Sequence, residues 1–124
     1  MTSNILIVED AEICRDALEV ALMKAPNLRV RSVTTAEEAL QWLAANDVSA
    51  LVTDLRLPSM DGFALIEEVR ARRRSLPIVV ISGDSDPKIP AQVADLGANA
   101  YFAKPYSPAA VLNKLEELIG AATA

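Results

Sequence analysis

Short apolar runs alternate with longer amphipathic stretches along the whole sequence, and this pattern constrains the fold more than any other feature. The apolar runs lie at residues 5–8, 28–31, 50–53, 78–81 and 100–103. Each run is followed by a stretch in which apolar residues recur at helical spacing. Parallel strands need a long crossover connection, which is usually a helix. We therefore expect an α/β fold in which a doubly wound, five-stranded parallel sheet is flanked by five helices.

The composition of the runs predicts where the strands lie in the sheet. Ile5–Val8 and Ile78–Ile81 are apolar at every position, as expected for central strands covered on both faces. Residues 28–31 instead alternate between apolar residues and arginine, which is typical of a strand with one wet face. The second strand is therefore expected at an edge.

The first helix carries two adjoining apolar stripes and is expected to end before Pro26. One stripe is Ile13, Ala17, Val20 and Ala21, and the other is Cys14, Leu18 and Leu22.

Capping signals delimit the other helices. The expected starts are Thr35 with Glu38, Asp61, Asp86 with Pro87, and Ser107 with Pro108, and the expected C-caps are Gly97 and Gly120. Arginines at positions 70, 72, 73 and 74 crowd the end of the third helix, where positive charge complements the helix dipole.

The size and charge of the chain exclude several classes of protein. A length of 124 residues fits one domain, which we place at residues 1–120, with the alanine-rich residues 121–124 as a tail or the stub of a linker. The net charge of -5 has the wrong sign for direct binding of nucleic acid. Unbroken apolar runs of four residues are far too short for a membrane span.

The cysteine and histidine content bears on the cellular compartment and on whether the chain itself could carry a phosphohistidine. Cys14 is the one cysteine, which agrees with a reducing compartment, and no secretory signal precedes the first strand, so we expect a cytoplasmic location. The sequence contains no histidine. Any phosphohistidine must therefore belong to a partner.

Polar residues follow four of the five strands. Glu9 and Asp10 follow the first, Asp54 the third, Ser82 the fourth and Lys104 the fifth. In an open parallel sheet these strand ends meet at one edge, where ligands bind.

Three carboxylates at one edge of a sheet repel one another unless a cation joins them, and an oxygen-only set of ligands favours Mg²⁺. With this metal and the Lys104 ammonium, Asp54 could act as a nucleophile toward phosphorus. Each residue taken alone could equally be a helix cap or a solvated surface group, but that explanation is weak for all of them together.

Four segments resemble the receiver domain of two-component response regulators: ILIVED, LVTDLRLPSMDG, IVVISG and ANAYFAKP. The resemblance covers essentially the whole chain. It implies a flavodoxin-like fold with strand order 2-1-3-4-5 and a cis Lys104-Pro105 bond.

The resemblance also implies the roles of individual residues. Asp54 would be the phosphoacceptor, charged by a sensor histidine kinase or a histidine phosphotransfer protein of a phosphorelay. Asp10 would ligate Mg²⁺ directly, Glu9 through water, and Arg56 through its backbone carbonyl. Lys104 would contact the phosphoryl group, Ser82 and Tyr101 would be the switch residues, and Gly83 would keep access open.

Position 56, two residues after Asp54, varies among receivers of this family, and position 84, two residues after Ser82, is Asp here. Arg56 and Asp84 are expected to pair across the mouth of the site and to modulate dephosphorylation. The alternative is a phosphatase of the haloacid dehalogenase type, which needs a second Asp two residues after the nucleophile as general acid. Arg56 occupies that place, so we expect a phosphoacceptor with self-catalysed phosphorylation and slow autodephosphorylation, and not an enzyme that turns over.

Phosphorylation should change the surface formed by the fourth helix, the fifth strand and the fifth helix. We expect this face to bind an output domain or target protein and to pair with a second phosphorylated copy.

Overall fold

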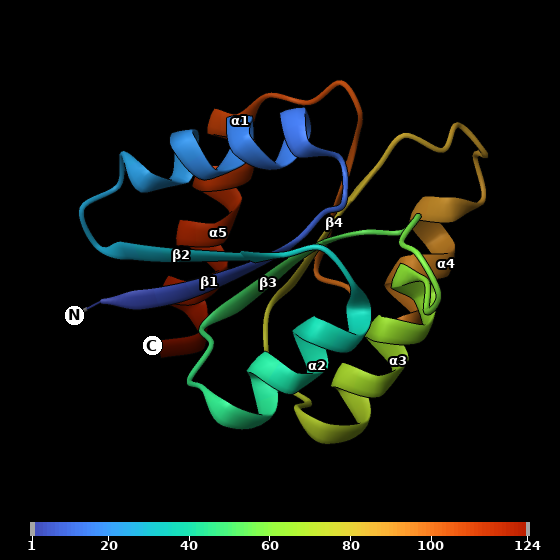
Figure 1. Cartoon of the computed structure of the whole chain (residues 1–124), viewed down its shortest axis with the longest axis horizontal. Helices are drawn as coiled ribbons and strands as arrows, with labels where there is room; N and C mark the ends of the chain where they lie inside the picture. The colour runs from blue at the N-terminus through green and yellow to red at the C-terminus, as the bar shows by residue number, and fades with distance from the viewer. Residues whose placement is uncertain (1, 124) are drawn as a thin grey trace.

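The sheet is the middle of three layers in the computed structural model, which describes residues 2–123 (Figure 1). Its strands are β1 (Ser3–Val8), β2 (Leu28–Val33), β3 (Ala50–Asp54), β4 (Ile78–Ser82) and β5 (Ala100–Ala103). The helices are α1 (Glu12–Met23), α2 (Ala36–Ala45), α3 (Gly62–Arg72), α4 (Ile89–Leu96) and α5 (Pro108–Thr123). All strand pairs are parallel and the order is β2-β1-β3-β4-β5, which confirms the predicted fold and the edge position of β2.

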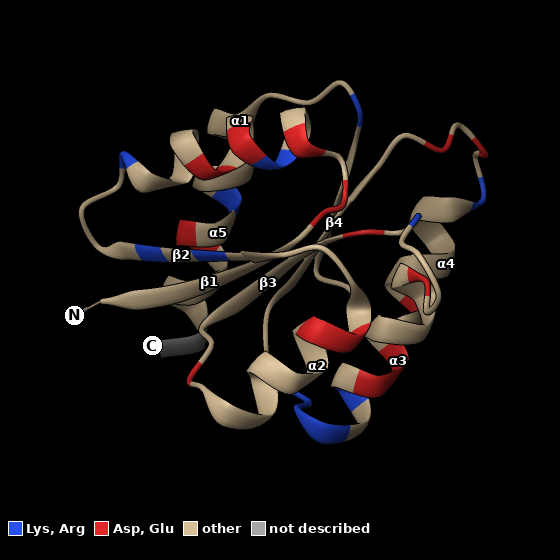
Figure 2. Ribbon diagram, in the orientation of Figure 1, with Lys and Arg blue, Asp and Glu red and all other residues tan. Residues whose placement is uncertain are grey.

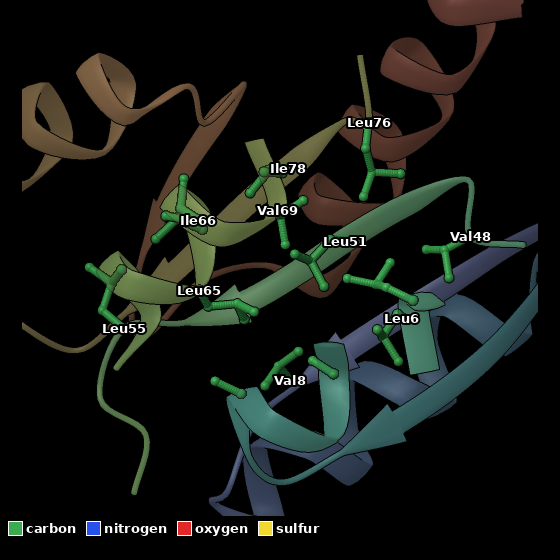
Figure 3. Packing of buried hydrophobic residues seen from close by; sticks show 14 of the residues in the cluster. Leu6, Val8, Val48, Leu51, Leu55, Leu65, Ile66, Val69, Leu76 and Ile78 are labelled. Atoms are coloured by element: carbon green, nitrogen blue, oxygen red, sulfur yellow. The ribbon is translucent and has the colours of Figure 1, made fainter. Parts of the chain in front are cut away.

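Each face of the sheet has its own core, because successive side chains of a strand point to opposite faces. Leu6, Val8 and Leu51 belong to the core under α2, α3 and α4, part of which is drawn in Figure 3. Ile7 and Val52 belong to the core under α1 and α5. The two cores hold the strands rigidly, so their carboxyl ends are fixed relative to one another.

Only one of the two stripes of α1 faces the sheet. Leu18 and Leu22 are fully buried, whereas Ile13 is 86% exposed and Val20 is 60% exposed. The helix packs on β2 and α5, and no other element of residues 2–123 covers its outer side. The periodicity therefore predicted the helix correctly, but it did not distinguish the stripe that packs from the stripe that faces outward.

Three of the predicted N-caps are confirmed. The Thr35 hydroxyl accepts a hydrogen bond from the Glu38 N–H (3.1 Å), the Asp61 carboxylate accepts one from Ala64 (2.9 Å), and the Ser107 hydroxyl accepts one from Ala110 (3.3 Å). The Asp86 prediction is wrong. The Asp86 carboxylate accepts a hydrogen bond from the Lys88 N–H and so forms a turn. The N-cap is Lys88, and α4 begins at Ile89.

The two glycines differ in their roles. Gly97 ends α4 with φ of 108°, as predicted for a C-cap. The prediction for Gly120 is wrong, because α5 continues through it to Thr123. Alanine is the strongest helix former, so the alanines that follow Gly120 extend the helix. Residue 124, the last of the predicted tail, lies outside the described residues.

Two arginines at the end of α3 join segments of the fold that are distant in sequence. The Arg70 guanidinium donates to the Gly97 carbonyl (2.7 and 3.0 Å) and to the Asn99 side chain (2.9 Å). Arg73 donates to the Leu43 carbonyl near the end of α2 (2.6 Å). These bonds give the arginine cluster a structural role that the sequence pattern did not reveal. No helix within residues 2–123 combines the length and apolar character that crossing a bilayer requires.

Candidate functional site

The carboxyl ends of the strands bring the predicted residues together. Within residues 2–123, the buried polar or charged side chains are Glu9, Thr53, Asp54 and Ser82. Three of these four were predicted from the strand ends. Burial of a charge is costly unless the charge is paired, so their surroundings decide what the site can do.

Lys104 pairs with two of the carboxylates. Its ammonium lies 2.5 Å from Glu9 Oε1 and 2.7 Å from Asp54 Oδ2, and its side chain is only 20% exposed. The Lys104-Pro105 bond is cis, as predicted. The ends of β1, β3 and β5 therefore meet at one ion-paired cluster.

The cluster shifts the ionisation of its members. Burial raises the pKa of Glu9 above its ordinary value of 4.5, although the hydrogen bond from Lys104 opposes this shift. Burial also disfavours the Lys104 ammonium, but its hydrogen bonds to Asp54 and Glu9 outweigh that effect and raise the pKa of Lys104. Lys104 therefore stays charged at neutral pH and offsets the repulsion between the two carboxylates.

Backbone groups fix the Asp54 side chain. Its Oδ1 accepts hydrogen bonds from the N–H groups of Leu55 (2.6 Å) and Arg56 (3.2 Å). With Lys104 on Oδ2, both carboxylate oxygens are held, so the side chain has one orientation.

Gly62 is a positioning residue that the sequence analysis did not single out. A Cβ at this position would lie 2.3 Å from the Asp54 carbonyl oxygen and 2.6 Å from Leu55 Cα. The Gly62 N–H also donates to the Leu55 carbonyl (2.9 Å). Only glycine lets α3 start this close to the end of β3. The available signal was the Asp-Gly pair at the start of the predicted helix.

The acidic residues fit a hard cation. Oxygen atoms of Glu9, Asp10 and Asp54 lie within 4.8 Å of one another, and Asp10 is exposed. Such a set of oxygen ligands, open to solvent on one side, matches the preference of Mg²⁺ for carboxylates and water.

Arg56 and Asp84 pair above this cluster, as predicted. The guanidinium lies 3.0 Å from Asp84 Oδ2, and the Arg56 side chain is 78% exposed. A hydrogen bond from the Asp86 N–H lowers the pKa of Asp84, and the bond from Arg56 adds to this effect. The pair joins the loop after β3 to the loop after β4.

Asp84 also contacts the two predicted switch residues. Its N–H donates to the Ser82 hydroxyl (3.1 Å), and its carbonyl accepts a bond from the Tyr101 hydroxyl (3.4 Å). Tyr101 is half-buried and packs against the core under α2, α3 and α4. Ser82 and Tyr101 are thus joined through one residue.

Comparison with known proteins agrees with this geometry. The model of the response regulator receiver domain family matches residues 5–116. The transcriptional regulatory protein GltR of Pseudomonas aeruginosa is 33% identical over 94% of the chain, which spans 48% of the length of GltR.

Two solved structures extend the similarity to three dimensions. A response regulator receiver domain protein (CheY-like) from Methanospirillum hungatei has a TM-score of 0.91 and 25% identity, with coverage of 99% of this chain and 98% of that one. The receiver domain of a sensor histidine kinase from Pseudomonas aeruginosa has a TM-score of 0.85 and 28% identity, with coverage of 97% and 99%. That structure holds a magnesium ion in its active site cleft.

Proposed function

Since this chain belongs to the family of response regulator receiver domains, we propose that Asp54 is the residue that accepts the phosphoryl group. Domains of this family are phosphoacceptors that act as phosphorylation-activated switches. The observation that supports Asp54 is its burial at the end of β3 in contact with Lys104 and two backbone N–H groups. We also propose the partners and the target of the whole protein.

The transfer itself uses residues of this chain. A carboxylate oxygen of Asp54 attacks the phosphorus of a phosphohistidine on a sensor histidine kinase or phosphotransfer protein. The P–N bond breaks and its electron pair leaves with the imidazole. The Lys104 ammonium neutralises charge on the transferred oxygens, and the Ser82 hydroxyl donates to one of them. Phosphorylation is therefore self-catalysed.

Glu9, Asp10, Asp54 and the backbone carbonyl of Arg56 would hold Mg²⁺. When bound, this ion supplies positive charge beside the oxygens of the transferring group. The oxygen-only ligands and the exposure of Asp10 support this choice of metal.

Loss of the phosphoryl group should be slow. The phosphatase alternative needs an acid two residues after the nucleophile, and Arg56 cannot donate a proton at neutral pH. Its guanidinium pairs with Asp84 at the mouth of the site, where both residues restrict the approach of water to Asp54.

Ser82, Asp84 and Tyr101 would transmit the signal to the face formed by α4, β5 and α5. We place the contact with an output domain, target protein or second phosphorylated copy on this face, and the protein in the cytoplasm. Residues 1–120 are the proposed receiver domain.

The experiment uses acetyl phosphate with Mg²⁺ and intact-protein mass spectrometry. We expect one added phosphoryl group, lost in the Asp54→Asn variant and on chelation of the metal, but kept in Asp61→Asn, which changes an exposed carboxylate outside the cluster and can still cap α3. Labelling of Asp54→Asn would show that the acceptor is elsewhere. Steady release of phosphate from simple phosphate esters would instead favour the phosphatase.

A further inference from the structure

β2 is an edge strand whose outer side is unpaired. The carbonyls of Asn27 and Val33 accept hydrogen bonds from the N–H groups of Ser3 (2.8 Å) and Glu9 (3.1 Å), on the side of β1. Because alternate residues of a strand direct their backbone groups to opposite sides, the N–H and C=O groups of Val30 and of its second neighbour, residue 32, face away from β1. No other strand within residues 2–123 pairs with this edge (Figure 1).

A hollow of about 380 Å³ lies beside the same strand. Its lining includes Arg29 and Arg31 of β2, Trp42 of α2, and Asn46 and Asp47 of the following loop. We call this hollow, together with the outer edge of β2, the β2 edge groove. None of the residues of the proposed phosphorylation site lines the hollow, so a ligand here would use a separate surface.

Two arginines give the β2 edge groove positive charge. Figure 2 marks the basic positions along the β2 ribbon in blue. Arg29 and Arg31 are exposed, and they lie on the same face of β2 because they are two residues apart. Neither takes part in any ion pair formed within residues 2–123. Arg31 instead lies over the Trp42 ring, 4.4 Å from its centroid. Asp47 is the one carboxylate in the lining.

This charge opposes the pairing of two copies of the chain through their β2 edges. Pairing of two β2 edges would place the arginines of one copy beside those of the other, and like charges across strands are destabilising. An added strand with carboxylates at alternate positions would instead face both arginines, because side chains on one face of a strand recur every second residue.

We infer that the β2 edge groove binds an extended acidic segment of a partner protein, which adds to the sheet as a further strand. The backbone of the segment forms hydrogen bonds with the outward N–H and C=O groups of residues 30 and 32, and these bonds give affinity. Its carboxylates pair with Arg29 and Arg31, and these pairs give specificity. The side chains between these carboxylates would lie on the opposite face of the sheet, where Val30 packs against the core under α1 and α5.

The test is an NMR titration with a peptide of alternating glutamate and valine residues, added up to about 1 mM so that weak binding is detected. We expect chemical shift changes at the amides of Val30 and Ser32 and at the Trp42 indole, and slower hydrogen exchange of the two amides. A peptide with lysine in place of glutamate should cause none of these changes. If no shift occurs, if the changes lie elsewhere, or if the lysine peptide binds equally well, the inference is wrong.

Two variants with the same change in net charge distinguish binding in the β2 edge groove from non-specific electrostatic attraction of the peptide. Arg31→Glu should weaken binding about tenfold, because it replaces an ion pair by a like-charge contact. Arg74→Glu, an exposed arginine that does not line the hollow, should change affinity by less than about twofold, because screening weakens distant charges. Equal effects of the two variants would overturn the inference. Shifts at Val30 that depend on protein concentration without peptide would identify a second copy as the occupant and would also overturn it.

Discussion

Replacement of Lys104 by Met tests whether its ammonium offsets the repulsion in the buried cluster. Methionine keeps an unbranched chain of similar length but leaves Glu9 and Asp54 without the cation that lies 2.5 and 2.7 Å from their oxygens. Removal of one partner from a buried ion pair costs about 3–5 kcal/mol. Since Asp10 beside the cluster is exposed and water can reach the site, we expect the lower end of this range, about 3 kcal/mol.

The sign of the pH dependence follows from the pKa shifts. Lys104 has a raised pKa in the folded protein, so its contribution to stability is complete below 10.5 and is lost only as the pH rises further. Without it, the pKa of Glu9 should rise more, and the folded variant then holds a proton that the unfolded chain has released. Between pH 7 and pH 5 the variant should recover up to about 1.4 kcal/mol for each pH unit over which this difference persists.

The measurements are urea and thermal denaturation at pH 7 and pH 5 in metal-free buffer. We expect the melting temperature of Lys104→Met to fall by roughly 10 °C at pH 7 and by less at pH 5. Added Mg²⁺ should stabilise the variant more than the parent protein, because it replaces the missing charge. Lys114→Met is the control, because Lys114 pairs with the exposed Glu117 at 3.5 Å and should change stability by less than about 0.5 kcal/mol. A loss below about 1 kcal/mol that is the same at both pH values would refute the reasoning.

Three further predictions concern the frame of the site and its ionisation. Gly62→Ala should destabilise the protein by about 1–3 kcal/mol in urea titrations, because its Cβ meets backbone atoms. Gly83→Ala should be nearly neutral, since its Cβ would lie 3.8 Å from Lys104 Cδ, and equal losses would contradict the packing argument. Arg70→Ala should lower the free energy of unfolding by about 2 kcal/mol, because its hydrogen bonds to the α4–β5 connection are lost. Arg72→Ala, which removes an exposed ion pair, should lower it by less than about 0.5 kcal/mol. Similar losses of stability in thermal melts would show that Arg70 is not structural. The raised pKa of Glu9 means that this group favours folding below pH 4.5 and loses that contribution as the pH rises through its folded pKa. In metal-free urea titrations, the stability of Glu9→Gln relative to the parent protein should therefore increase over that pH range. A constant difference in stability would show that the pKa of Glu9 is not raised.

The strand ends were the most predictable part of this molecule. Topology alone brings the carboxyl ends of parallel strands to one edge, so Glu9, Asp54 and Lys104 could be placed together without knowledge of any side-chain contact. The Thr35 and Asp61 caps were also predictable, because each depends on a hydrogen bond that spans three residues.

The errors lie where distant segments decide the outcome. Both stripes of α1 are apolar, and only the positions of β2 and α5 determine that Leu18 is buried while Ile13 is exposed. Asp86 has the residue type of an N-cap but instead forms a turn before α4. Gly62 was missed because the Asp-Gly pair at the start of α3 does not reveal that a Cβ there would lie 2.3 Å from the Asp54 carbonyl oxygen.

The hydrogen bonds of Asp84 suggest a more specific mechanism for the proposed switch than the sequence could. The sequence resemblance named Ser82 and Tyr101 as switch residues but did not reveal which residue joins them. In the structure, the Asp84 N–H donates to Ser82, its side chain pairs with Arg56, and its carbonyl accepts from Tyr101. Since the Ser82 hydroxyl already accepts from this N–H, its proton is free for a phosphoryl oxygen. A displacement of Ser82 toward Asp54 would therefore pull on Asp84, and through it on both the guanidinium at the mouth of the site and the tyrosine on β5.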